Sequence, residues 1–113
     1  MLEVISMKIF IKSLVNGDII LEEVDASEVQ GFKDCALVHH RTNFSINGKR
    51  HSSLDQWVVY DIPTGLLIVY GRTRQETLEK LVEKRFQMEE ARKTQLYEKR
   101  IQEFERLKEI HKA

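Results

Sequence analysis

Short apolar runs alternate with turn residues through the first 72 residues, and this pattern predicts strands joined by tight turns. The first two runs, at 7–15 and 18–24, flank Asn16 and Gly17. Asn-Gly between two such runs favours a hairpin, because a type I′ turn needs positive φ angles at both central residues. We therefore expect a β-hairpin over residues 7–24.

Three later apolar runs are also expected to be strands, at residues 35–41, 57–62 and 66–70. Pro63, Thr64 and Gly65 predict a tight turn between the last two, with Pro presetting φ and Gly supplying a positive φ. Residues 25–30 are expected as a short helical turn or loop, and 43–52 as a small polar hairpin around a second Asn-Gly pair. Turn signals this closely spaced favour an antiparallel meander over βαβ units.

Several of these strands carry apolar residues on both faces. Trp57 and Val59 alternate with Val58 and Tyr60, for example, so both faces of the sheet need to be covered. The segment that follows can cover one face. The other face favours either dimerisation or a curled, barrel-like sheet.

The last third of the chain, residues 73–113, contains no Gly and no Pro and consists mostly of good helix formers. It opens with Thr73 and Glu76 at the spacing of a capping box, in which each side chain receives the backbone N–H of the other residue. The pattern predicts one helix of about 39 residues, roughly 58 Å long at 1.5 Å per residue. Whether it bends near residues 89–93 is left open by the sequence.

This helix carries two apolar segments separated by a charged interval. The first, at 78–86, is expected to pack on the sheet. The second begins roughly 27 Å further along the axis, which predicts a surface for a second copy or a protein partner. An amphipathic tail in solvent is the alternative. The expected interface residues are Leu96, Tyr97, Ile101, Phe104, Leu107 and Ile110.

Together these patterns predict an α+β fold, a small antiparallel β-meander of about four to six strands followed by one long C-terminal α-helix that partly projects. The expected division is a sheet domain at 1–72 and a helix at 73–113. Within the helix, residues 73–88 are expected to pack on the sheet and residues 89–113 to project or pair.

Composition narrows the classes of function. The 18 basic and 18 acidic residues cancel, so bulk attraction to nucleic acid or to an anionic membrane is not expected. No apolar run approaches the roughly 20 residues of a membrane span, and the first residues lack the positive charge of a signal peptide. The one cysteine, Cys35, suits a reducing compartment. We expect a cytoplasmic protein with no membrane partner.

No established catalytic motif is present, so we expect no enzyme activity, no catalytic residue and no cofactor. Cys35 and His39 share a strand face, but four residues of extended chain separate them by about 13 Å, too far for a thiolate–imidazole pair. His39 and His40 point to opposite faces, which argues against a metal site that would also use His51. No metal is expected.

The segment 39–54 contains no acidic residue and combines cations with an aromatic side chain. Such a combination suits phosphates and a stacked base. The alternative function is therefore nucleic-acid binding through Arg41, Phe44, Lys49 and Arg50.

Residues 57–66 (WVVYDIPTGL) and 71–78 (GRTRQETL) form a strand–turn–strand–helix pattern. This pattern resembles one found in small uncharacterised proteins of phages and mobile elements, and the resemblance covers about a quarter of the chain. It implies no catalytic residue. It does imply a protein that binds and blocks a host machine, such as an anti-CRISPR inhibitor. We therefore expect a non-catalytic protein-binding or oligomerising module, with a protein partner or a homodimer.

Overall fold

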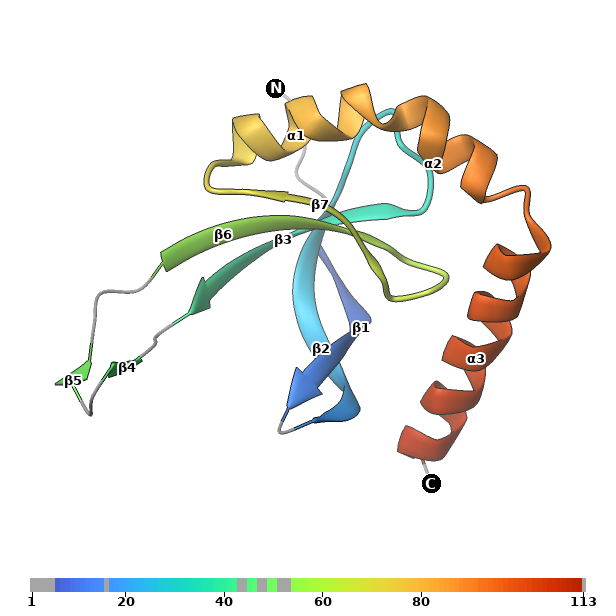
Figure 1. Ribbon diagram of the computed structural model, residues 1–113, viewed down its shortest axis with the longest axis horizontal. Helices are drawn as coiled ribbons and strands as arrows, with labels where there is room; N and C mark the ends of the chain where they lie inside the picture. Colours follow the sequence, from blue (N-terminus) through green and yellow to red (C-terminus); the bar gives the residue numbers. More distant parts are fainter. Residues whose placement is uncertain (1–5, 16, 43–44, 47–48, 51–53, 113) are drawn as a thin grey trace.

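The computed structural model describes residues 6–15, 17–42, 45–46, 49–50 and 54–112. In this part of the chain seven strands precede three helices: β1 (Ser6–Val15), β2 (Asp18–Glu28), β3 (Cys35–Thr42), β4 (Ser45–Ile46), β5 (Lys49–Arg50), β6 (Leu54–Asp61), β7 (Leu67–Gly71), α1 (Arg74–Glu83), α2 (Arg85–Ala91) and α3 (Gln95–Lys112). The predicted α+β class is confirmed, with an antiparallel sheet followed by a long helical C-terminal third (Figure 1).

The main sheet has five antiparallel strands in the order β1-β2-β3-β6-β7, which is the predicted meander. The short strands β4 and β5 pair only with each other and form a separate ribbon between β3 and β6. Sequential hairpins explain this order, because each tight turn places a strand beside the one before it. The first strand β1 and the last strand β7 therefore form the two edges of the sheet.

The expectation of a helical turn or loop over residues 25–30 is wrong for its first part, because β2 continues to Glu28. Pairing with β1 extends to Ser27, and Ser27 and Glu28 then pair with Leu37 and Ala36 of β3. Cross-strand pairing thus overrides the weak β propensity of Asp and Glu in this segment. Since β2 and β3 share only this short contact, the β1–β2 hairpin bends away from the other strands (Figure 1).

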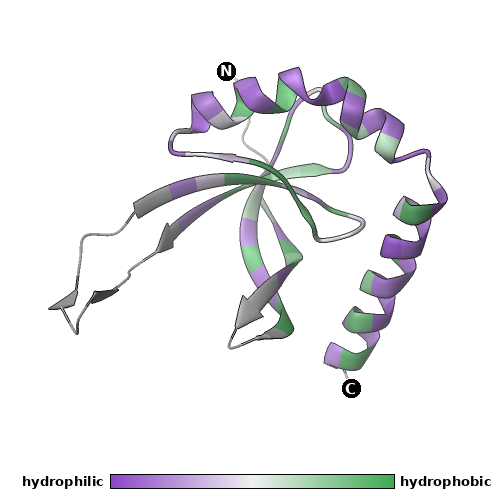
Figure 2. Cartoon of the chain, viewed as in Figure 1, coloured by the Kyte–Doolittle hydropathy of each residue, from purple (hydrophilic) through white to green (hydrophobic). Residues whose placement is uncertain are grey.

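Two hydrophobic clusters lie on opposite faces of β3 and β6. The first joins the β1–β2 hairpin to these strands through Ile9, Ile11, Ala26, Ala36, Val38, Val58 and Tyr60. The second joins the other face to α1 through Val29, Cys35, Leu37, Val59, Val69 and Leu81. The hairpin therefore covers the face that the helices do not, which corresponds to the curled-sheet alternative. Figure 2 shows the contrast between the mostly apolar central strands and the mixed surface of the helices.

The predicted capping box at the start of α1 is confirmed in its main contact, since the Glu76 N–H donates to Thr73 Oγ1 at 3.1 Å. The Glu76 carboxylate accepts the Arg72 N–H at 3.0 Å, which lowers the pKa of Glu76. Gly71 lets this turn approach the strand closely, because a Cβ there would lie 2.7 Å from Thr77 Oγ1. The buried side chains Thr77 and Leu81 then fix α1 on the sheet.

The helical third is divided into three pieces rather than running straight. Lys84 interrupts it mildly, whereas the chain turns sharply between α2 and α3 (Figure 1). Thr94 is the cause of the second break, because its hydroxyl donates to the Ala91 carbonyl at 2.7 Å and accepts the Tyr97 N–H at 3.2 Å. A Thr side chain that bonds nearby backbone groups in this way ends one helix and caps the next.

Residues 89–113 were expected to project or pair, and this expectation is corrected by the turn, because α3 returns to its own sheet. Phe104 is only 1% exposed and packs against the β6–β7 turn, where a Cβ on Gly65 would lie 2.5 Å from its ring. Lys12 lies over the same ring, and Phe10 of β1 meets His111 edge-on at 5.5 Å. Phe104 is therefore not available to a second molecule.

Candidate functional site

A buried carboxylate, Asp61, organises the corner where β6, the β6–β7 turn and two helices meet. It lies at the end of β6 and accepts the Thr64 N–H at 3.2 Å and the Thr64 hydroxyl at 2.6 Å. The Thr64 oxygen in turn accepts the Leu66 N–H at 3.3 Å. The carboxylate thus holds the turn in shape.

Arg92, at the end of α2, pairs with this carboxylate at 2.6 Å. The same guanidinium donates to the carbonyls of Lys33 at 2.8 Å and Asp34 at 3.2 Å. One side chain therefore ties α2 to β6 and to the β2–β3 connection. A planar guanidinium with five donors is suited to such a junction.

Tyr97, in the first turn of α3, completes the cluster. Its hydroxyl lies 2.9 and 3.0 Å from the two Asp61 oxygens. Burial, together with this hydrogen bond to the carboxylate, raises the pKa of Tyr97 well above its ordinary value. The phenol therefore stays protonated and donates, which attaches the start of α3 to the sheet.

This cluster is an anchor and has no exposed reactive group. Among the described residues no buried side-chain oxygen or nitrogen lacks a hydrogen-bond partner. Cys35 lies 3.7 Å from the Met88 sulfur, and burial raises the pKa of its thiol, which disfavours the nucleophilic thiolate. No group of three or more metal-binding side chains occurs in the described ranges.

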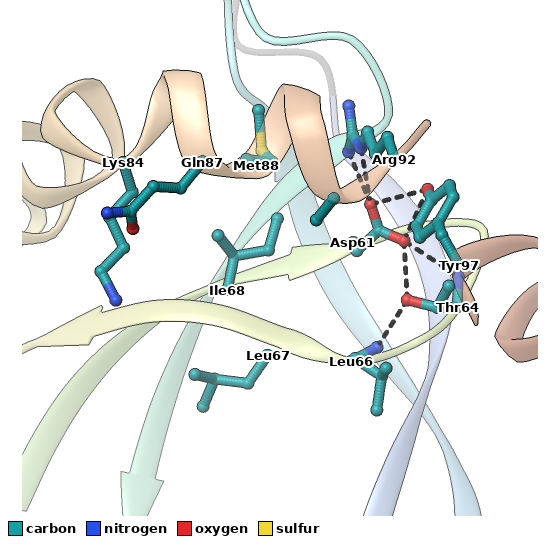
Figure 3. Close-up of a pocket in the computed structure, with 11 residues that line it drawn as sticks. Asp61, Thr64, Leu66, Leu67, Ile68, Lys84, Gln87, Met88, Arg92 and Tyr97 are labelled. Carbon is teal, nitrogen blue, oxygen red and sulfur yellow. Dashed lines mark hydrogen bonds and ion pairs between the residues drawn. The ribbon is translucent and has the colours of Figure 1, made fainter. Parts of the chain in front are cut away.

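Beside the anchor lies a cavity of about 270 Å³ between β7 and α2 (Figure 3). The Asp61 cluster closes one end, and Lys84 and Gln87 lie at the other. Its remaining walls are apolar and come from Leu66, Leu67, Ile68, Met88 and Ala91. The volume is at the lower end of the range for ligand pockets, and it suits one large apolar side chain.

A second cavity, of about 490 Å³, continues along β7 beside the last turn of α1. It shares Leu67, Ile68 and Lys84 with the first cavity. Four consecutive strand residues, 67–70, line it, although neighbouring side chains of a strand point to opposite faces. The backbone edge of β7 itself must therefore form part of the wall. The two cavities together are called the β7 groove below, with the 270 Å³ cavity as its inner cavity and the 490 Å³ cavity as its outer cavity.

The backbone orientation of Tyr70 also indicates that the open edge of β7 faces the groove. Its carbonyl accepts from the Lys80 ammonium at 3.0 Å, so this carbonyl points away from β6. In an antiparallel strand the N–H and C=O of one residue point to the same side, so the Tyr70 N–H also faces outward. The side chains of Leu67 and Tyr70 are 48% and 54% exposed on this edge.

A third cavity, of about 610 Å³, lies on the other side of α1. Phe32, Leu37, Trp57 and Leu78 contribute apolar walls, with Glu28 and Arg74 among the charged ones, and the Trp57 ring stacks on His39 at 4.0 Å. The neighbouring histidine, His40, shares a hydrogen bond of 2.8 Å with the Tyr60 hydroxyl. This cavity is not formed along an open strand edge.

The six α3 residues expected to contact a partner or a second copy differ in how far they are buried. Phe104 is buried, and Tyr97, Ile101 and Leu107 are partly buried, whereas Leu96 and Ile110 are 61% and 65% exposed. Four residues are expected to contact nucleic acid. Phe44 lies outside the described residues, and the side chains of the other three are not described: Arg41, Lys49 and Arg50. Apart from Phe104, which the fold itself covers, both sets stay predictions as binding surfaces.

Of the anchor and groove residues, the sequence pointed only to Tyr97, which was expected at an interface rather than on Asp61. A signal existed for Thr94, because a Thr within a charged helical stretch is a candidate N-cap. A signal also existed for β7, since the last strand of a meander lies at an edge. Asp61 and Arg92 are 31 residues apart, and no local pattern pairs them.

Comparisons of the chain with protein-family models, with curated proteins and with solved structures give no match. Among the helices of the described chain, none is long and apolar enough to cross a membrane.

Proposed function

We propose that this chain is a non-catalytic protein-binding module that receives an extended segment of its partner along the β7 groove. The observation that carries the proposal is that four consecutive residues of an edge strand line a cavity. An open edge offers a row of main-chain donors and acceptors that another strand can satisfy.

The dimensions support an extended occupant. The five residues of β7 give an edge of roughly 16 Å at about 3.3 Å per residue, enough for a short added strand. The cavity beside Met88 and Ala91 would then take one of its side chains. Main-chain bonds would supply affinity, and the cavity would supply selectivity.

We further propose that the partner is a host protein. The resemblance to phage and mobile-element proteins favours a host protein, such as a component of a defence system that this chain would inhibit. The homodimer expected from the sequence is an alternative occupant of the same edge, because two β7 strands can in principle pair around a two-fold axis.

The experiment selects binders from a library of random linear peptides and tests them on two variants. Tyr70→Pro removes the outward N–H without removing a hydrogen bond to β6, since Pro is tolerated on the open side of an edge strand. Tyr70→Ala is the matched control, because it removes the same side chain and keeps the N–H. We expect Tyr70→Pro to weaken peptide binding at least tenfold beyond Tyr70→Ala, a difference of about 1.4 kcal/mol.

N-methylation of the selected peptide provides a second test that does not depend on the folding of a variant. Methyl groups on alternate residues should abolish binding in one register and leave it unchanged in the other, because alternate N–H groups of an added strand face β7. Peptides that bind Tyr70→Pro and Tyr70→Ala equally, with no register effect of methylation, would contradict the proposal.

A further inference from the structure

We infer that the segment received by the β7 groove is acidic and places a carboxylate side chain beside Lys84, next to a large apolar residue in the 270 Å³ cavity. This inference rests on the proposed function and specifies the chemistry of the partner. It is carried by the charges that line the groove.

The other cations of the groove already have partners. Arg92 pairs with Asp61 at 2.6 Å. Lys80 lies 3.4 Å from Glu76 and donates to the Tyr70 carbonyl. Their charges are therefore largely met within the fold.

Lys84 differs from them in both position and pairing. It lines both cavities. Within the described chain its ammonium makes no ion pair or side-chain hydrogen bond. Figure 3 shows its side chain extending from the helix toward β7. The neighbouring acid Glu83 lines only the outer cavity, and Asp61 is paired with Arg92. Among the described residues that line the inner cavity, no acid is therefore left to compensate the positive charge of Lys84.

The same charges argue against a second copy of this chain. A two-fold β7–β7 pairing would bring the unpaired Lys84 of both molecules to one interface. Like charges placed opposite each other across a strand pair are destabilising, and edge lysines are a common device against self-pairing. An acidic segment from another protein instead complements Lys84.

The apolar part of the motif follows from the walls of the inner cavity. Ile68, Met88 and Ala91 enclose this cavity, and Lys84 lines it too. The apolar walls and the Lys84 side chain are both accessible from the β7 edge. A segment lying along this edge can therefore present a large apolar side chain and a nearby carboxylate together. An apolar side chain alone would leave Lys84 without a partner, and a carboxylate alone would leave the inner cavity unfilled.

The test repeats the peptide selection against the wild type and against Lys84→Glu. The matched control is Lys99→Glu, which makes the same change of charge on exposed α3 and lines none of the three cavities. We expect Asp or Glu enrichment near an apolar residue with the wild type and with Lys99→Glu. With Lys84→Glu we expect Lys or Arg enrichment at that position, and about tenfold weaker binding of the wild-type peptides.

The outcomes separate the inference from the proposed function. Peptides that Tyr70→Pro blocks but that show no acidic preference and bind Lys84→Glu normally would overturn the inference alone. If no selected peptide is blocked by Tyr70→Pro, the proposed function fails and the inference fails with it. A dimer that Tyr70→Pro dissociates, without any peptide binding at the edge, would assign the groove to a second copy and overturn the acidic partner.

Discussion

The two edges of the sheet, β1 and β7, are treated very differently by the rest of the chain. On β1 the Lys12 N–H donates to the Gly65 carbonyl at 3.2 Å, and the side chains of Phe10 and Lys12 meet His111 and Phe104 of α3. On β7, within the part of the chain that the structure describes, the outward backbone meets only the Lys80 ammonium at Tyr70, and two cavities follow the strand. The protein closes one edge with its own α3 and leaves the other accessible.

The difference shows what the sharp turn after α2 achieves. A straight helix would have carried Phe104 away from the sheet and left the β1 edge open. The turn at Thr94 and the Asp61–Arg92–Tyr97 anchor bring α3 back instead. The anchor also closes one end of the β7 groove, so the same residues protect one edge and shape the other.

The largest effect is expected from Phe104→Ala. Removing a side chain that is 1% exposed should lower the free energy of unfolding by about 3–5 kcal/mol, through lost burial and the cavity left behind. Amide hydrogens of β1 should also exchange faster, because α3 no longer covers that edge. Urea unfolding and hydrogen exchange measure the two effects. Ile110→Ala, at a 65% exposed position on the same helix, should change stability by less than about 0.5 kcal/mol.

Asp61→Asn should have the next largest effect, because it leaves Arg92 without its counter-charge. Breaking a buried pair costs about 3–5 kcal/mol, and partial exposure of Arg92 reduces the expected loss to about 2–3 kcal/mol. The inner cavity should lose its closed end, so peptide binding should weaken as well. Unfolding curves and peptide titrations measure both. A fully stable Asp61→Asn protein would show that the anchor does not hold α3.

Tyr97→Phe removes only one hydrogen bond to the carboxylate and should lower stability by about 1.5–3 kcal/mol. The variant also tests the raised pKa of Tyr97. A group whose pKa is higher in the folded state contributes stability that is present below its unfolded pKa of about 10 and is lost as pH rises beyond it. The difference between wild type and Tyr97→Phe should therefore be constant near neutral pH and shrink above about pH 10. A difference that is the same at all pH values would contradict the assignment.

The smallest expected effect is a difference in stability between two proline variants, one on each edge of the sheet. Lys12→Pro removes a donor that the Gly65 carbonyl uses, whereas Tyr70→Pro removes one that faces the open groove. Lys12→Pro should therefore lower stability by about 1 kcal/mol more than Tyr70→Pro, each corrected by its Ala variant. Equal losses would mean that the two edges are not distinguished in solution.

Local signals predicted the sheet and the start of the helices well. Turn residues such as Gly17, with a φ of 84°, and the Thr73–Glu76 cap act within a few residues and are visible in the sequence. The sequence left a bend near residues 89–93 open, because neither Gly nor Pro marks the α2–α3 turn. Thr94 acts there through its side chain, and Arg92 acts through Asp61, far away in the chain. The β7 groove depends on that long-range folding and could not be placed beforehand.

Hydrogen exchange on the protein with and without a selected peptide tests the open β7 edge most directly. We expect the Tyr70 amide to exchange rapidly in the free protein and to become at least tenfold more protected when the peptide binds. The Lys12 amide on β1 should be protected in both states, because the Gly65 carbonyl already accepts from it. A peptide that binds without protecting the Tyr70 amide would contradict the account.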